Sequence, residues 1–187
     1  MRIEKIVEVV GTTLLAVKYH EDKKDVLTTL IDTWRNPVQT ADFFRKRSAL
    51  LNAFAPYAQH TVRSAGLQTV AEALQIKSQI LAAARIGCLE PPFKPYHRQG
   101  LQIGKLGMFS EKKYQGFDQG IGWCRLYGVK LEPNTFIIVG GGIKLVKRTS
   151  DCPILEAQAA RMMMVVKYLE DLGVHDIDGL EDLLQED

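Results

Sequence analysis

The pattern of apolar and polar positions divides the chain into an N-terminal strand pair, a helical region, a group of strands and a final helix. Residues 2–10 and 13–19 are rich in β-branched side chains and meet at Gly11, which predicts a β-hairpin. In the region that follows, apolar residues recur at helical spacing in segments that are interrupted at Pro37 and Pro56. This spacing predicts three helices.

The boundaries of these helices come from capping and breaking residues. The first helix is expected over residues 23–34, and Thr40 is expected to cap the second. The third helix is expected over residues 67–85, with Gly87 ending it. Its spacing predicts this inward-facing set: Leu67, Val70, Ala71, Leu74, Ile80, Leu81 and Ala84.

The strand group begins after a change in composition near residue 90, because ten of the fifteen glycines lie between positions 100 and 142. Residues 124–131 alternate as a strand does, 135–139 form an apolar strand, and 143–147 alternate again. The glycines at 140–142 predict a bend or bulge between the last two strands.

A long helix is expected to follow, capped by Asp151 and ended by Gly173, with a short acidic helix over 177–185. One face of the long helix is expected to pack on the sheet, through Leu155, Ala159, Met162, Val166 and Leu169. Strands and helices in separate runs are typical of an α+β fold. We therefore predict a single α+β domain over 1–187, in which the N-terminal hairpin and the C-terminal strand group form an antiparallel sheet packed by helices.

Several protein classes are excluded by composition and spacing. No apolar run approaches the ~20 residues that cross a bilayer, and the N-terminus lacks the apolar stretch of a secretory signal, so we expect a cytoplasmic protein. Three widely spaced cysteines favour reduced thiols. The histidines and cysteines lack metal-ligand spacing, and the glycine runs lack phosphate-loop spacing. We therefore predict neither a metal site nor a cofactor.

Charge is strongly segregated although the net charge is only +2. Residues 94–148 carry ten Lys/Arg against three acidic side chains, a net +7, whereas 149–187 carry two basic and ten acidic residues, a net −8. A basic block of this kind is the expected footprint of a polyanion such as RNA. A solvated basic surface is the plainer interpretation, and the acidic extension over 173–187 could either be solvated or cover the basic block.

Side chains suited to RNA chemistry fall in the same block. Arg125 and Tyr127 are two positions apart and share a strand face, Lys144 lies in the last strand, and His97 and Arg98 precede the group. In such a site a base takes the proton of a 2′-hydroxyl, which attacks the neighbouring phosphorus. Lys and Arg stabilise the charge that develops there, so the reaction needs no metal.

Residues 125–131, 136–145 and 147–157 also carry a family resemblance. They resemble the C-terminal half of toxins of the RelE/ParE superfamily, in particular the HigB-like branch, where a basic segment with Thr ends a strand and precedes a Pro and a helix. The resemblance covers residues 94–172. It implies a compact sheet with a basic concave face, ribosome-dependent mRNA cleavage or, in other branches, gyrase inhibition, and an antitoxin protein as partner.

The resemblance and the strand-face argument together give the candidate site residues. The catalytic candidates are Arg125, Lys147, Arg148 and His97, and the candidates for nucleic-acid contact are Lys105, Lys144, Arg98 and Tyr127. Two other functions stay open. The absence of a Tyr or His just after the last strand favours a non-catalytic nucleic-acid or protein-binding module. The helical half could instead form the interface of an assembly protein, such as a homo-oligomer.

Overall fold

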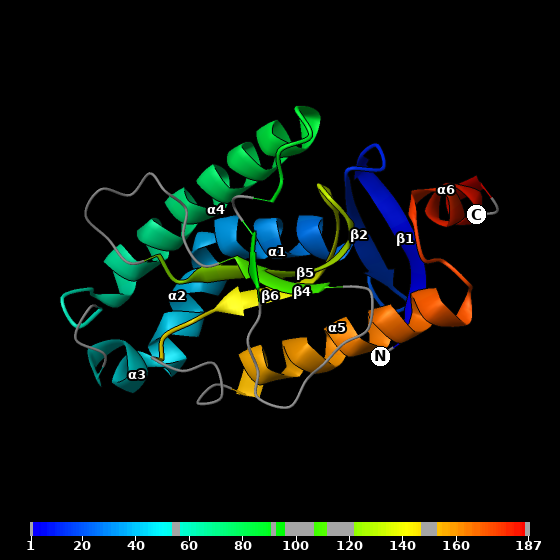
Figure 1. Ribbon diagram of the computed structural model, residues 1–187. Coiled ribbons are helices and arrows are strands. Elements are labelled where there is room, and N and C mark those ends of the chain that lie inside the picture. The colour runs from blue at the N-terminus through cyan, green and yellow to red at the C-terminus, as the bar shows by residue number, and fades with distance from the viewer. Residues whose placement is uncertain are drawn as a thin grey trace.

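The computed structural model describes residues 2–53, 57–90, 93–95, 107–111, 122–146 and 153–185, with backbone only for the segments 93–95, 107–111 and 154–156. Within these residues a six-stranded sheet has the order β1-β2-β6-β5-β4-β3 and is packed by helices (Figure 1). The α+β prediction is confirmed. No helix in the described part of the chain is long and apolar enough to cross a membrane.

The sheet joins strands from the two ends of the chain. The strands are β1 (Ile3–Val10), β2 (Leu14–Tyr19), β3 (Phe93–Pro95), β4 (Gly107–Glu111), β5 (Cys124–Glu132) and β6 (Thr135–Ile143). β1 and β2 form the predicted hairpin, and Gly11 at its turn has a positive φ of 46°, which suits glycine. Four strand pairs are antiparallel, while β2 and β6 pair in parallel. That parallel pair connects the hairpin to the C-terminal strand group.

Helices cover both faces of the sheet. They are α1 (Val26–Arg35), α2 (Pro37–Lys46), α3 (Ser48–Ala53), α4 (Val62–Arg85), α5 (Pro153–Asp171) and α6 (Ile177–Gln185). A Cβ added at Gly141 would meet Leu30 of α1, whereas one added at Gly140 would meet Gln158 of α5. Adjacent positions of β6 thus face opposite helical layers, as strand alternation requires. Every residue of β6 is consequently buried.

The glycine run lies inside β6 and does not separate two strands. Tyr127 pairs with Gly140 and Gly128 with Ile138, so Val139 is an extra residue at a bulge directly before the glycines. The irregularity predicted there is therefore present. The separate strand predicted over 143–147 is not, because β6 ends at Ile143 and residue 147 lies outside the described residues.

The helical region differs from prediction in its caps and in the number of its helices, because the expected second helix is divided at Arg47 into α2 and α3. Pro37 does end the first helix, but it also begins α2 as that helix's first residue. Asn36 caps α2 by accepting the N–H groups of Val38 and Gln39. Thr40, predicted as the cap, is a buried residue inside α2 whose hydroxyl donates to the Asn36 carbonyl. The prediction overlooked that Asn and Pro together make a stronger start signal than a lone Thr.

α4 is longer than predicted and is rotated about its axis. It begins at Val62, where Thr61 and Ser64 form a capping box. The residues that face the core are Ala65, Gly66, Thr69, Glu72, Ala73, Ile76, Ile80 and Ala84. Leu67 and Leu74, predicted inward, are exposed. Most of the buried face is small or polar, and an apolar pattern therefore does not reveal it.

The C-terminal helices follow the prediction closely. Of the predicted sheet-facing set, Ala159, Met162, Val166 and Leu169 are buried on α5, and the side chain of Leu155 lies outside the described residues. Gly173, with a positive φ of 72°, follows the end of α5. The predicted cap Asp151 lies outside the described residues. α6 occupies the predicted range (Figure 1). The backbone N–H of Ile177, the first residue of α6, donates a hydrogen bond to the Glu132 side chain at the end of β5.

Candidate polyanion-binding site

Three of the eight predicted site residues have described positions, and all three lie on β5 or just after β6. They are Arg125, Tyr127 and Lys144. His97, Arg98, Lys105, Lys147 and Arg148 lie outside the described residues. The geometry of the candidate site is accordingly built from the β5–β6 ladder and from the elements that support it.

Arg125 and Lys144 both lie at one end of this ladder. Arg125 pairs with Gly142 across the two strands. The ladder then continues beyond Ile143, because the Lys144 N–H donates to the Trp123 carbonyl at 2.8 Å. The Arg125 side chain is half-buried, and its Nη1 donates to the Cys124 carbonyl at 2.8 Å. Two cations are thus held at the sheet end from which the chain continues towards Lys147 and Arg148.

Tyr127 lies in the core and offers almost no surface to a ligand. It shares the strand face of Arg125, as predicted, but its side chain is only 2% exposed. It pairs with Gly140, above which Gln158 of α5 is also buried. The strand-face argument identified the correct side of β5. It did not anticipate that α5 covers that side at this point, and so we remove Tyr127 from the candidate nucleic-acid contacts.

A third cation, Arg161 of α5, lies over Gly140, the residue that pairs with Tyr127. Arg161 was not among the candidate site residues predicted from the sequence. Its Nη1 lies 3.5 Å from Gln158 Oε1, and its guanidinium lies 5.6 Å from the ring centroid of Tyr19. The Tyr19 hydroxyl donates to the Val139 carbonyl at 2.7 Å, and burial raises the pKa of Tyr19 to about 12. The i, i+3 spacing of Gln158 and Arg161 on the predicted sheet-facing side of α5 was the available signal.

A buried carboxylate anchors the start of β5, directly before Arg125. Glu72 of α4 is 4% exposed and accepts the N–H groups of Trp123 and Cys124 at 3.0 and 2.9 Å. The Gln68 amide donates to it at 3.3 Å, and the Trp123 indole N–H donates to the Thr69 hydroxyl at 2.8 Å. This arrangement satisfies the backbone where β5 enters the sheet, and it fixes the backbone position from which Arg125 extends.

Aromatic rings enclose the same junction. The Trp123 ring contacts Phe44, Tyr57 and His60, with centroid distances of 5.3, 5.2 and 5.1 Å. Residues from α2, from the segment before α4 and from β5 therefore meet around one indole. Such contacts exclude water from the Glu72 carboxylate, and this has a consequence for its titration.

Burial raises the pKa of Glu72 above its ordinary value of 4.5, although hydrogen bonds from Cys124, Gln68 and Trp123 lower it in part. The folded chain therefore binds this proton more tightly than the unfolded chain. The resulting stability is complete below the unfolded pKa and is lost as pH rises through the folded pKa. As pH falls from neutral towards 4.5, we expect the wild type to gain stability relative to Glu72→Gln. Urea unfolding of both chains at each pH measures this difference, and parallel pH profiles would contradict it.

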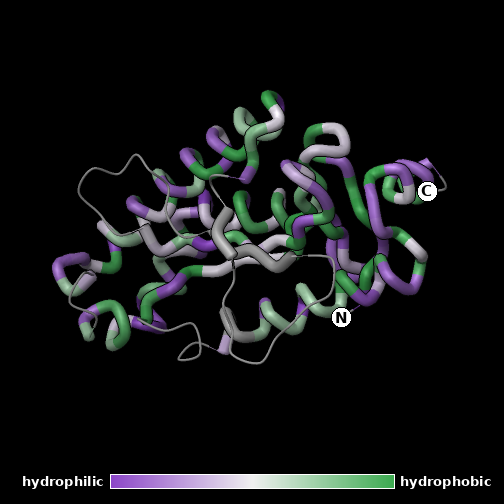
Figure 2. Tube along the Cα trace, in the orientation of Figure 1, coloured by the Kyte–Doolittle hydropathy of each residue, from purple (hydrophilic) through white to green (hydrophobic). Residues whose placement is uncertain are grey.

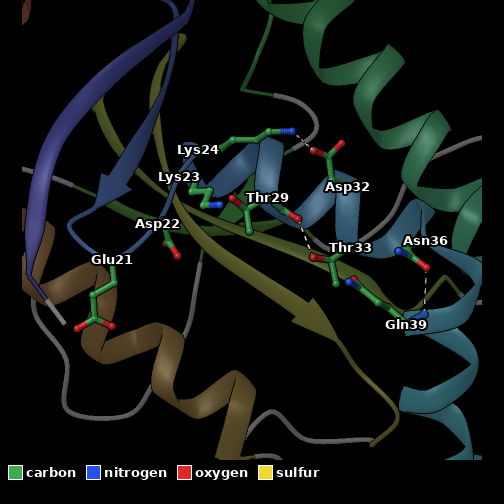
Figure 3. A pocket seen from close by; sticks show the side chains of 9 residues that line it. All are labelled: Glu21, Asp22, Lys23, Lys24, Thr29, Asp32, Thr33, Asn36 and Gln39. Carbon is green, nitrogen blue, oxygen red and sulfur yellow. Dashed lines mark hydrogen bonds and ion pairs between the residues drawn. The ribbon is translucent and has the colours of Figure 1, made fainter.

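A polar hollow of about 440 Å³ lies apart from this site, between the loop after β2, one side of α1 and the start of α2. Figure 3 shows that its lining side chains are all polar or charged, with the Lys24 ammonium and the Asp32 carboxylate paired at one rim. Of the predicted site residues with described positions, none lines it. Among the described residues, no group of three His, Cys, Asp or Glu is placed to hold a metal ion.

Comparison with known proteins identified no relative of this chain. No family model matches the chain, and no curated protein or solved structure is significantly similar to it.

Proposed function

We propose that this chain is a cytoplasmic, toxin-like RNA-binding protein that cleaves mRNA on the ribosome without a metal. The observation that carries the proposal is the position of Arg125 and Lys144 at the same end of the β5–β6 ladder. From there the sequence runs directly into Lys147 and Arg148, within a block of net charge +7. Phosphate neutralisation by such a block drives binding to RNA.

The position of the acidic helix is consistent with an accessible basic end. The N-terminus of α6 is bonded to Glu132, whereas Arg125 lies near the opposite end of the same strand. Within the described residues, α6 therefore lies away from the end where Arg125 and Lys144 lie. This favours the solvated alternative for the acidic extension over the masking one.

The proposed reaction is an intramolecular transesterification. A base removes the proton of a ribose 2′-hydroxyl, whose oxygen attacks the adjacent phosphorus while the 5′-oxygen leaves and takes up a proton. His97 is our candidate for proton transfer, and Arg125, Lys147 and Arg148 are candidates to stabilise the charge on the phosphoryl oxygens. We assign Lys105, Lys144 and Arg98 to contacts with the RNA backbone.

We expect purified protein to cleave mRNA bound to ribosomes, and we expect Arg125→Gln to slow this cleavage by about 10²-fold, the order that a lost charge-stabilising donor costs. Primer extension on ribosome-bound mRNA locates and quantifies the cuts. The matched control is Arg35→Gln, which changes an exposed arginine at the end of α1. Intact mRNA in the presence of wild-type protein would contradict the catalytic proposal.

A non-catalytic binding module is the second candidate, because the two accessible site side chains among the described residues, Arg125 and Lys144, carry hydrogen-bond donors only and supply no base for proton transfer. For either function we expect RNA binding to weaken steeply between about 50 and 200 mM salt. Lys144→Glu and Arg148→Glu should each weaken it several-fold more than Lys23→Glu, which alters an exposed lysine of the β2–α1 loop. Filter binding measures both effects. Salt-independent binding, or equal effects of the three variants, would contradict the placement.

A further inference from the structure

One face of α4 carries an apolar seam that nothing in the described structure covers. Arg63, Leu67, Val70, Leu74 and Lys77 follow one another at alternating intervals of four and three residues. We call these five residues the α4 ridge. Leu67 is 61% exposed and Leu74 is 48% exposed. Spacings of four and three place side chains in one line along a helix, and such a line forms the seam of a helix pair.

The opposite face of α4 packs into the core of the protein. Ala65, Thr69, Ala73, Ile76 and Ile80 point into the protein and are almost fully buried. α4 thus has one face that packs against its own chain and a second apolar seam that is left over. Apolar periodicity is the pattern of a buried helix face. Figure 2 shows hydrophobic positions recurring along the whole of α4, which lies at the outside of the molecule.

The charge around this seam is of one sign. Arg63 and Lys77 close its two ends, Arg85 lies further along the helix, and all three are exposed. None of the three forms an ion pair with a described residue. The single acidic residue of α4, Glu72, is buried on the other face. Asp32 of α1 lies near enough to Lys77 to be affected by its charge, but Asp32 is itself paired with Lys24.

We propose that the α4 ridge is a docking surface for an acidic amphipathic helix of a protein partner. The leucines of that helix would pack on Leu67, Val70 and Leu74, and its carboxylates would meet Arg63 and Lys77. Charge complementarity at the two ends fixes the position of the helix along the seam. This interaction surface is separate from the β5–β6 end and does not depend on the proposed RNA binding.

The same charges argue against a second copy of this chain as the occupant. In a symmetric pairing each ridge meets itself. When two such helices pack antiparallel about Leu67 and Leu74, Arg63 of one copy lies opposite the region of Lys77 of the other. Like charges would then face each other at both ends of the seam, which destabilises the pair. An acidic partner removes this repulsion.

The proposal is tested with two synthetic helical peptides that share leucines at the seam positions and differ only in their flanks, one carrying Glu and the other Lys. We expect the full-length protein to bind the Glu peptide and not the Lys peptide in fluorescence anisotropy. Leu74→Ala should weaken this binding about tenfold, as the loss of a packed apolar side chain does. Leu172→Ala, which truncates a leucine that is 49% exposed in the turn directly after α5, is the matched control and should leave binding unchanged.

A charge variant separates the two parts of the surface. Arg63→Gln combined with Lys77→Gln should weaken binding of the Glu peptide and flatten its salt dependence, while Leu74→Ala should keep that dependence. Equal binding of the two peptides, or no binding of either, would overturn the proposal. Sedimentation showing a dimer of the free protein that Leu74→Glu disperses would also overturn it, because the occupant would then be a second copy.

Discussion

Replacing Glu72 with Ala is expected to lower the free energy of unfolding by about 3 kcal/mol, because two buried N–H groups lose their acceptor at roughly 1–3 kcal/mol each. Trp123 and Cys124 supply those groups, and both residues are only 1% exposed. Removing a buried carboxylate returns part of this loss near neutral pH, since its burial disfavours the charged form. The cavity left among the aromatic rings adds to the loss.

Urea unfolding at neutral pH measures the Glu72→Ala effect, with Glu170→Ala as the matched control. Glu170 is exposed near the end of α5, and truncation of such a surface residue is expected to change stability by less than about 0.5 kcal/mol. Glu72→Gln should fall between the two, because the amide oxygen still accepts while the amide NH₂ faces other donors. If Glu72→Ala were as stable as the control, the carboxylate would not be the anchor of β5.

An element of this fold could be predicted from the sequence where the environment of its residues is determined by their neighbours along the chain. The hairpin and α5 satisfy that condition. Gly11 marks the turn of the first, and the spacing of Ala159, Met162 and Val166 marks the buried side of the second. In both, local pattern and tertiary packing agree, as minimally frustrated sequences require.

For α4, by contrast, neighbours along the chain do not determine which face is buried. Its inner face packs closely through Gly66, where an added Cβ would lie 3.4 Å from the Thr40 hydroxyl. Small and polar residues suit such a close contact, whereas the leucines that a periodicity argument follows lie on the other side. The parallel pairing of β2 with β6 is likewise invisible in the sequence, because it depends on which edge of the hairpin the later strands meet.

For the candidate site, the residues that carry charge could be found and the residues that position them could not. Arg125 and Lys144 are visible as cations on alternating strands, and the structure brings them to one end of a ladder. Glu72 is separated from Trp123 by 51 positions in the chain. A single glutamate on a helix has no local signature that distinguishes a buried anchor from a solvated side chain.

The second large effect is expected at Gly141, where an added methyl group has no space. A Cβ there would lie 2.6 Å from the Arg125 carbonyl oxygen and 2.8 Å from Leu30 Cδ1. The leucine can rotate, but the carbonyl belongs to the neighbouring strand and can move only if β5 and β6 separate. Since overpacked core sites lose typically 1–3 kcal/mol, we expect Gly141→Ala to cost about 3 kcal/mol, the upper part of that range.

The matched control for Gly141→Ala is the same exchange at Gly179 in α6, where the nearest atom to an added Cβ is 3.4 Å away. Alanine is favoured over glycine within a helix by roughly 0.5–1 kcal/mol, so this variant should be more stable than the wild type. Thermal unfolding of the two variants should thus shift in opposite directions. If Gly141→Ala unfolded at the wild-type temperature, β5 would not approach β6 as closely as described. The position of Arg125 opposite Gly142, on which the proposed site depends, would then be wrong as well.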